Sequence, residues 1–479
     1  MEYVVKGRNP SSVFRFFEEI SAIPRPSYHE ASIADYLCAF AKTRGLECYR
    51  DELHNVLMKA PATKGQEHRA PILFQGHTDM VCEKNGDVEH DFLKDPLHLR
   101  VEGDLLRATG TTLGADNGIA VAMMLALLDG AVAEHPPIEC LFTVSEETGM
   151  EGVNGFDYSR ITASRLVNLD SERLGCVTAG CAGGIRSDLS LSYTEEPFAG
   201  CAISLRIGGL IGGHSGEHID KGRANANKLM GRLLSTLLAK TDARILCVEG
   251  GSKTNAIPRE CRVTLAVSDV DAASEILLTE AERIASELIP EDRGFCVTVE
   301  DCEPEPMMLS RADTLRVATV LACTANGVLA MNRDVEGLVE YSRNLGVVST
   351  EDGKISFAFS TRSSMDSRLD ASVAELDLLA RTVGAEAVHH GRYPGWSYAI
   401  DSPLRESYCA AYREVTGHEA QVNVIHAGLE CGVICSKLPR MDAISIGPTM
   451  FNIHSPDEAL SLSDTEAFWK TLVKLIEIL

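Results

Sequence analysis

Histidine and acidic residues recur at the ends of short apolar runs along this sequence. The runs have the length and composition of buried strands, and the polar residues that follow them are His77, Asp79, Glu146, Glu147, Asp170 and His454. Asp116 differs in position, because it lies just before the apolar, alanine-rich stretch 118–128. Open α/β sheets place their sites beyond the carboxyl ends of strands, so we expect these side chains to converge on one rim of a sheet. Imidazole and carboxylate groups together are typical ligands of Zn²⁺.

Each of these residues taken alone also has an ordinary interpretation, as a solvated loop charge or a helix N-cap. Taken together, their carboxylates would repel one another unless cations neutralised them. Three carboxylates and two histidines suffice for two zinc ions if one carboxylate bridges, and a bridging hydroxide then brings the formal charge to zero. Two ions about 3.5–4 Å apart lower the pKa of a shared water and polarise a substrate carbonyl. The spare member of the Glu146–Glu147 pair is placed to act as general base.

Two capping-box patterns predict where helices begin. Ser27-x-x-Glu30 precedes a periodic run over 33–40, which predicts a helix that ends at Gly45. Ser463-x-x-Glu466 predicts the start of a last helix that runs to the C-terminus.

Strands are expected between these helices. The segments with strand-like composition and flanking polar or glycine residues are 71–75, 138–145, 166–169 and 443–446. The long apolar stretch 118–128 lies between the first two and predicts a buried helix. Strands that alternate with helices predict an α/β fold with a mostly parallel central sheet flanked by helices.

The pattern changes at the glycine-rich segment 180–184. From about 186 to 397 the sequence shows short alternating runs separated by amphipathic helices such as 272–288, which is typical of an inserted α+β domain. A Pro-Gly breaker in 392–396 marks the return to the first domain. The predicted organisation is a first domain made of 1–186 and 398–479, with an inserted domain at 187–397.

Composition limits the partners and the compartment. Lys and Arg number 45 against 69 Asp and Glu, which gives a formal net charge of −24 across 479 residues. Binding to phosphate backbones or anionic lipid depends on clustered positive charge, so we expect neither a nucleic acid nor a membrane as partner. The 15 cysteines include no CxxC pair and are expected to be reduced thiols. The N-terminal segment lacks the pattern of a secretory leader, and we therefore expect a cytoplasmic protein.

Ten short strings, in order along residues 23–458, resemble those of the aminoacyl-histidine dipeptidases of the PepD type. This group belongs to the co-catalytic di-zinc family that also contains carnosinases and aminoacylases. The strings are GHTDMVCEKN, TTLGADNGIAVA, EETGMEG, NLDSE, GCAGG, GGHSG, GRANAN, TNAIPRE, IHAGLECG and HSPDE.

The resemblance implies a zinc-peptidase catalytic domain and a ligand for each position of a two-zinc centre. His77 and Asp170 would bind one zinc ion, Glu147 and His454 the other, and Asp116 would bridge them. Mn²⁺ or Co²⁺ could substitute for Zn²⁺ at such nitrogen and oxygen ligands.

The resemblance also implies roles around the metals. Asp79 would orient His77, and Glu146 would be the general base. The inserted domain would be a lid through which a homodimer forms. Its substrate-binding residues, together with a glycine from the C-terminal part, would be His214, Asn255, Arg362 and Gly428. Arg362 can pair with a C-terminal carboxylate, and His214 can stabilise an oxyanion.

The expected function is that of a cytosolic di-zinc dipeptidase that hydrolyses Xaa-His dipeptides, with carnosine among the candidate substrates. A metal-bridging hydroxide would attack the peptide carbonyl with Glu146 as base. The alternative is a di-zinc amidohydrolase or acylase, or a tripeptidase, with the same ligands, and a third is a catalytically silent metal-binding protein. The sequence departs from many relatives at His54–Asn55, where they carry Gly-Asn. It carries Asp170 where carboxypeptidase-like relatives tend to carry Glu, which favours small peptides with free amino ends.

Overall fold

The computed structural model describes residues 3–303, 307–333, 335–351 and 353–479. The chain forms two compact units. The first consists of Met1–Gly180, Tyr398–Val424 and Leu429–Leu479, and the second of Cys181–Ser397 and Ile425–Gly428. The short segment Ile425–Gly428 therefore groups with the second unit although the chain on both sides of it belongs to the first.

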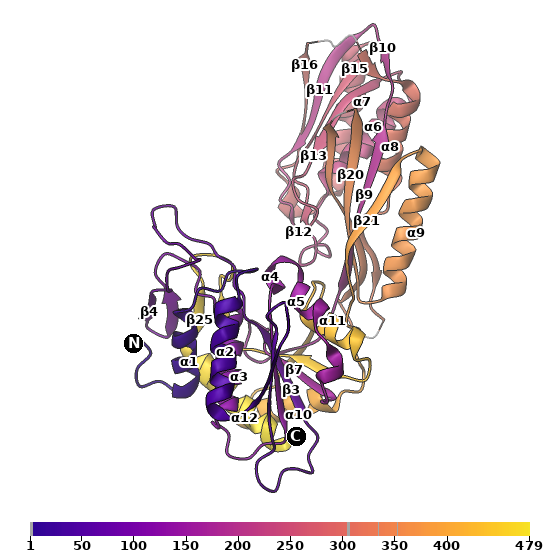
Figure 1. The fold of residues 1–479 in the computed structure, drawn as a ribbon. Helices are drawn as coiled ribbons and strands as arrows, with labels where there is room; N and C mark the ends of the chain where they lie inside the picture. The colour runs from indigo at the N-terminus through magenta and orange to yellow at the C-terminus, as the bar shows by residue number, and fades with distance from the viewer. Residues whose placement is uncertain (1–2, 304–306, 334, 352) are drawn as a thin grey trace. The chain divides into compact units, whose positions relative to one another are not determined.

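The first unit is built on a mixed eight-stranded sheet (Figure 1). Its strands, in spatial order, are β1 (Glu47–Arg50), β2 (Val56–Ala60), β6 (Ile138–Thr143), β3 (Ile72–His77), β7 (Arg165–Asn168), β23 (Asp442–Ser445), β8 (Cys176–Cys181) and β22 (Gln421–Ile425). The four central strands β6, β3, β7 and β23 are parallel to their neighbours in that group. Strands β1, β2 and β8 pair antiparallel, so the predicted parallel sheet is confirmed only for its centre.

Helices and a small antiparallel sheet complete the first unit. The helices are α1 (Ser11–Ser21), α2 (Ala31–Arg44), α3 (Ala115–Leu128), α4 (Glu146–Gly149), α5 (Glu151–Gly155), η1 (Tyr158–Arg160), α10 (Pro403–Thr416), α11 (Glu430–Lys437) and α12 (Leu462–Ile478). The small sheet has the order β24 (Met450–Phe451), β25 (Ala459–Ser461), β5 (Leu105–Ala108) and β4 (Leu99–Glu102). Nearly every residue of α3 is buried, which explains why its sequence is apolar on all sides.

The two predicted capping boxes are wrong. Helix α2 does end at Gly45, which adopts a left-handed conformation (φ 67°), but its N-cap makes no side-chain hydrogen bond. The Ser27 hydroxyl instead donates to Asp79 Oδ2 (2.8 Å), and the Glu30 carboxylate accepts from the amide and the hydroxyl of Ser145. At the last helix the N-cap is Ser461, two residues earlier than predicted. A local pattern cannot distinguish a cap from a residue that serves a distant loop.

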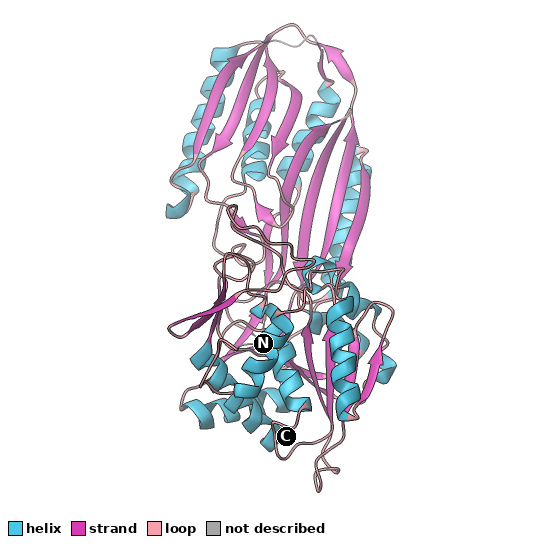
Figure 2. Cartoon of the chain, turned by 60° about the vertical axis from the view of Figure 1, so that its left-hand side comes forward, coloured by secondary structure: helices cyan, strands magenta, loops and turns pink. Residues whose placement is uncertain are grey.

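The second unit is an antiparallel sheet with helices on one face, as the inserted α+β pattern predicts (Figure 2). Among the described residues the sheet has the order β16 (Cys296–Cys302), β11 (Cys201–Gly208), β15 (Cys261–Val267), β13 (Arg244–Gly250), β19 (Val339–Glu351), β20 (Lys354–Ser363), β9 (Gly183–Ser192) and β21 (Glu386–Tyr393), with β18 (Gly327–Met331) beside β19. Two short ribbons pair β10 (Glu195–Pro197) with β17 (Met307–Leu309) and β12 (Gly213–His214) with β14 (Ala256–Ile257). The helices are α6 (Ala226–Leu238), α7 (Val270–Glu287), η2 (Pro290–Asp292), α8 (Arg311–Cys323) and α9 (Asp366–Val383).

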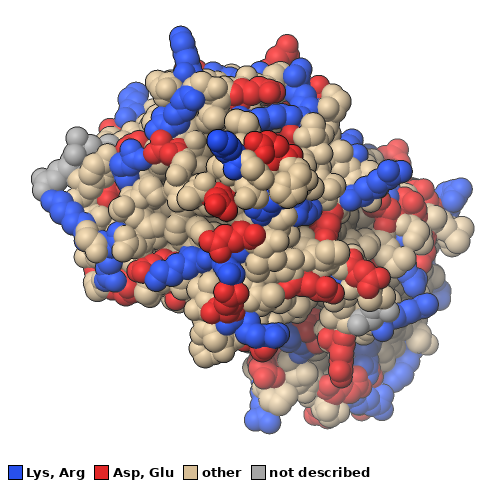
Figure 3. Space-filling view, turned by 90° about the horizontal axis from the view of Figure 1, so that it is seen from below, with Lys and Arg blue, Asp and Glu red and all other residues tan. Residues whose placement is uncertain are grey.

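On the face shown in Figure 3, Lys and Arg side chains are interspersed with Asp and Glu. Among the described residues, no helix combines the length and the hydropathy that a bilayer span requires.

Candidate metal centre and neighbouring polar residues

Parallel strands bring the predicted ligands to one edge of the first unit's sheet. Strand β3 ends at His77, β6 leads into α4 with Glu146 and Glu147, and Asp170 follows β7 by two residues. In the β3–β6 ladder His77 lies opposite Thr143, which is three residues before Glu146. Asp116 stands at the start of α3, and His454 lies in the loop between β24 and β25. The structure therefore brings together residues that are up to 377 positions apart, from His77 to His454.

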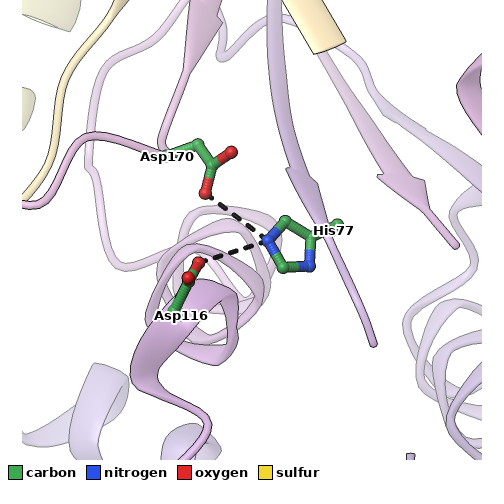
Figure 4. A group of neighbouring side chains, drawn as sticks. All are labelled: His77, Asp116 and Asp170. Atoms are coloured by element: carbon green, nitrogen blue, oxygen red, sulfur yellow. Dashed lines mark hydrogen bonds and ion pairs between the residues drawn. The ribbon is translucent and has the colours of Figure 1, made fainter. Parts of the chain in front are cut away.

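Two groups of donor atoms share one carboxylate. His77 Nε2 lies 3.2 Å from Asp116 Oδ1 and 3.5 Å from Asp170 Oδ1 (Figure 4). His454 Nε2 lies 3.1 Å from Asp116 Oδ2 and 3.0 Å from Glu147 Oε1. Asp116 thus presents one oxygen to each imidazole, which is the arrangement required of a bridging ligand.

The donor set is suited to metal ions. Zinc bonds of about 2.0–2.1 Å in a tetrahedron separate neighbouring donor atoms by roughly 3.3 Å, close to the distances between these side chains. Each of three groups has its donor atoms within 4.8 Å of one another: His77, Asp116 and Asp170; Asp116, Glu147 and His454; and His77, Glu146 and Glu147. The side chains could therefore hold two ions, with nitrogen and oxygen ligands for each.

Asp79 connects His77 with the loop that carries Glu146 and Glu147. Its carboxylate is fully buried and accepts hydrogen bonds from the amides of Glu146 (3.1 Å) and Glu147 (3.2 Å) and from the Ser27 hydroxyl. His77 Nδ1 lies 3.2 Å from the backbone carbonyl oxygen of Asp79 and 3.4 Å from its Oδ1. A carboxylate on the far nitrogen of a ligating histidine fixes the orientation of the ring.

The electrostatics of this cluster favour positive charge. Burial would lower the pKa of His77, but Asp170, Asp116 and Asp79 raise it well above its usual value. Hydrogen bonds to Asp116 and Glu147 raise the pKa of His454 to about 10. Burial raises the pKa of Asp170 to about 6 and that of Glu146 well above the value of an exposed glutamic acid. Burial would also raise the pKa of Asp116, but its hydrogen bonds to His454 and His77 lower it instead. Raised pKa values of the imidazoles beside several carboxyls are typical of a site with excess negative charge, which attracts cations.

Part of the second unit's predicted set also clusters. Strand β12 carries His214, whose Nδ1 accepts from the amides of Gly216 (3.3 Å) and Glu217 (3.4 Å), so that Nε2 carries the proton. Burial and the charge of Arg362 lower the pKa of His214. Arg362 on β20 is 9% exposed and donates to the Tyr393 hydroxyl (3.1 Å).

The remaining two predicted substrate-binding residues lie on connecting segments. The backbone carbonyl of Asn255 accepts a hydrogen bond from the amide of Ser215 (2.8 Å), the residue after His214. Asn255 itself is exposed. Gly428 ends the segment Ile425–Gly428, in which His426 Nε2 lies 2.7 Å from the Ser342 hydroxyl. Burial and the nearby Arg362 lower the pKa of His426 to about 4, so this imidazole is neutral.

Sequence reasoning missed four buried ionisable residues that lie around the candidate metal centre. They are Arg25, Glu30, Glu430 and Glu458. Glu430 and Glu458 stand within the strings IHAGLECG and HSPDE, so the resemblance contained a signal for both. Arg25 lies between two prolines, and nothing in its local sequence distinguishes it from a surface arginine.

The sequence profile described as peptidase family M20/M25/M40 matches residues 73–478, a range that includes all five predicted ligands. The chain belongs to this family. It is therefore a hydrolase that acts on peptide bonds, and the α/β zinc-peptidase fold expected from the sequence is confirmed.

Two relatives match this M20 peptidase over almost its whole length. The cytosol non-specific dipeptidase of Escherichia coli (strain K12) is 38% identical over 473 residues, which cover 98% of each chain. The crystal structure of aminoacylhistidine dipeptidase from Vibrio alginolyticus has a TM-score of 0.94 and 38% identity, covering 99% of this chain and 97% of the other. The resemblance found in the sequence is thereby confirmed. The aminopeptidase PepT from Bacillus cereus shares the fold, with a TM-score of 0.56 and 18% identity over 98% of both chains.

Proposed function

We propose that this M20 peptidase is a cytoplasmic dipeptidase with a two-zinc centre, and that Xaa-His dipeptides, including carnosine, are among its substrates. The observation that carries the proposal is Asp116, which presents one carboxylate oxygen to His77 and the other to His454. The similarity to two dipeptidases over nearly the full chain supports the substrate class.

The ligand assignment follows the two groups of donors. His77 and Asp170 would hold one ion, Glu147 and His454 the other, and Asp116 both. When bound, such ions act as Lewis acids on the scissile carbonyl and lower the pKa of a bound water towards neutrality. Asp79 holds the His77 ring through Nδ1 and leaves Nε2 directed at Asp116 and Asp170.

Glu146 is assigned as the general base because its backbone is held and its carboxylate is not needed as a ligand. The Asp79 carboxylate accepts a hydrogen bond from the backbone amide of Glu146, which fixes the start of α4. Burial raises the pKa of the Glu146 carboxyl towards the range in which a carboxylate takes a proton efficiently. Its carboxylate would take a proton from the attacking water and deliver it to the nitrogen of the leaving amine.

Four residues of the second unit are assigned to the substrate. Arg362, which is largely buried, would bind the terminal carboxylate of the peptide through its guanidinium. The protonated Nε2 of His214 would donate to the oxygen of the reacting carbonyl. Asn255 and the backbone at Gly428 would complete the recognition of the peptide. On this proposal the second unit is the lid, and two copies pair through it.

The test is the release of amino acids from a peptide panel by zinc-reconstituted protein. The panel contains Xaa-His dipeptides, dipeptides without histidine, a tripeptide and N-acetylated amino acids. Glu146→Ala should keep both metals and lose activity by about 10²–10⁴-fold. The same change at Glu275, an exposed residue of α7, should leave the rate unchanged.

The outcomes separate the parts of the proposal. A Glu146→Ala variant with near-normal activity would exclude it as the base. Cleavage of dipeptides without histidine but of no Xaa-His dipeptide would exclude the proposed substrates and keep the dipeptidase. Protein that binds two metals and cleaves only acetylated substrates or tripeptides would identify the amidohydrolase or tripeptidase alternative instead.

A further inference from the structure

Glu458 joins the loop of one predicted ligand to the loop of another. It lies four residues after His454, is 2% exposed, and directly precedes β25. Its carboxylate accepts four backbone N–H groups, those of Leu113 (2.7 Å), Gly114 (2.9 Å), Ala115 (2.8 Å) and Asp116 (3.3 Å). One side chain thus holds the whole turn that ends at Asp116 against the loop that contains His454.

Arg25 joins that same turn to a third loop. Arg25 is also 2% exposed, and its Nη1 donates to the carbonyls of Thr78 (2.9 Å) and Asp79 (3.3 Å). Its Nη2 donates to the carbonyl of Gly114 (2.6 Å). The backbone directly after His77 is therefore connected to the backbone two residues before Asp116.

The turn is shaped to admit the guanidinium. Gly114 has φ +65°, and a Cβ there would lie 2.5 Å from Arg25 Nη2. A Cβ at Gly118, on the first turns of α3, would lie 2.6 Å from the same nitrogen. Burial lowers the pKa of Arg25, and the negative charges of Glu458 and Asp79 oppose that effect. The two glycines thus leave the space that the guanidinium occupies.

We infer that Arg25 and Glu458 are positioning residues that act on different pairs of metal ligands, an inference that rests on the proposed two-metal centre. Arg25 sets the spacing between His77 and Asp116, and Glu458 sets the spacing between Asp116 and His454. Both side chains hydrogen-bond to backbone groups of the ligand loops, and not to the side-chain atoms that would bind the metals. Loss of Arg25 should therefore weaken the binding of the ion held by His77, Asp116 and Asp170. Loss of Glu458 should weaken the binding of the ion held by Asp116, Glu147 and His454.

The experiment measures each ion separately. His454→Ala leaves only the first group of ligands complete, and His77→Ala leaves only the second. Co²⁺ and Zn²⁺ affinities of these two proteins are measured by competition with a chromophoric chelator, and the Co²⁺ absorption spectrum reports the geometry of the ligands. Arg25→Lys should lower the affinity of the His454→Ala protein by about 10–100-fold and leave that of the His77→Ala protein unchanged. Glu458→Gln should do the reverse.

Matched controls carry the same chemical changes at buried residues of the second unit. Arg343 is 2% and Glu340 8% exposed, so Arg343→Lys and Glu340→Gln test whether any buried charge change alters metal affinity. If Arg25→Lys fails to fold, Gly118→Ala replaces it, because the added methyl displaces the guanidinium and keeps its charge.

Two results would overturn the inference. The first is that wild-type protein binds two metals, but each variant lowers the affinity for both ions equally or for neither. That result would refute the division of roles alone. Wild-type protein that binds fewer than two metals would refute the proposed function and the inference together.

Discussion

Replacement of Glu430 by glutamine should change how stability depends on pH. Glu430 opens α11, is fully buried, and accepts from the Thr143 hydroxyl (2.8 Å) and the Gln75 amide. Burial raises its pKa to about 8, against 4.5 for an ordinary glutamic acid. The folded protein therefore holds a proton at neutral pH that the unfolded chain releases, whereas a glutamine holds none in either state.

The sign and size follow from this difference in bound protons. Below pH 4.5 both states of the chain carry the proton, and the stabilising contribution is fully present. As the pH rises from 4.5 to about 8, the wild-type free energy of unfolding falls by about 1.4 kcal/mol per pH unit relative to the variant. Over roughly 3.5 pH units the difference would reach about 5 kcal/mol at most.

The assay is urea unfolding of chelator-treated protein at pH 5.5, 6.5 and 7.5, followed by tryptophan fluorescence. The two tryptophans lie in different units, Trp469 on α12 and Trp396 in the second unit, so a Trp396→Phe background reports on the first unit. Glu275→Gln, at an exposed position, is the control and should show a constant difference from wild type. A constant difference for Glu430→Gln as well would show that this carboxyl is ionised in the fold, and the reasoning would be wrong.

Three further predictions concern the site. Asp79→Ala leaves two backbone N–H groups of α4 without their carboxylate, so the free energy of unfolding should fall by about 1–3 kcal/mol per donor. Metal affinity, measured by chelator competition, should fall by about 10–100-fold. Unchanged affinity would show that His77 needs no carboxylate at Nδ1. Asp116→Ala should lose both metals in elemental analysis, and a variant that retains both would exclude a bridging role. Arg362→Lys should raise KM for dipeptides by about tenfold or more, with little effect on kcat, because lysine cannot form the bidentate pair. Dipeptide amides lack the terminal carboxylate, so an equal rise in their KM would contradict the contact between Arg362 and that carboxylate.

The sequence was sufficient to predict that these histidines and carboxylates meet at one edge of the sheet, but not which residues support them. His77, Glu147 and Asp170 were predictable because the carboxyl ends of parallel strands share one edge, whatever the loops between them do. The contacts of Arg25 depend on a different kind of information. They join positions 25, 78 and 114, and no periodicity or spacing rule links residues so far apart.

The division into units shows a second limit. The string IHAGLECG reads as one motif, yet its first residues belong to the second unit and Glu430 is buried in the first. His426 contacts Ser342 and Glu430 contacts Thr143, so the two ends of the motif meet different surroundings. A single inserted domain at 187–397 was the simplest interpretation of the pattern, and composition gave no sign that four residues near 425 group with it.

One part of the support was nevertheless readable from the strands. Gln75 and Asn168 are polar residues that follow apolar residues of their strands, and each stands two positions before a predicted ligand, His77 and Asp170. Alternation places residues i and i+2 on the same face, so these amides must form a row directly beneath the ligands. They are indeed register partners, fully buried, and joined by a 2.7 Å hydrogen bond from Asn168 Nδ2 to Gln75 Oε1. The Gln75 amide nitrogen carries two hydrogens, and Thr143 on β6 accepts one of them (3.0 Å), so the second needs an acceptor from outside the sheet, which Glu430 on α11 supplies.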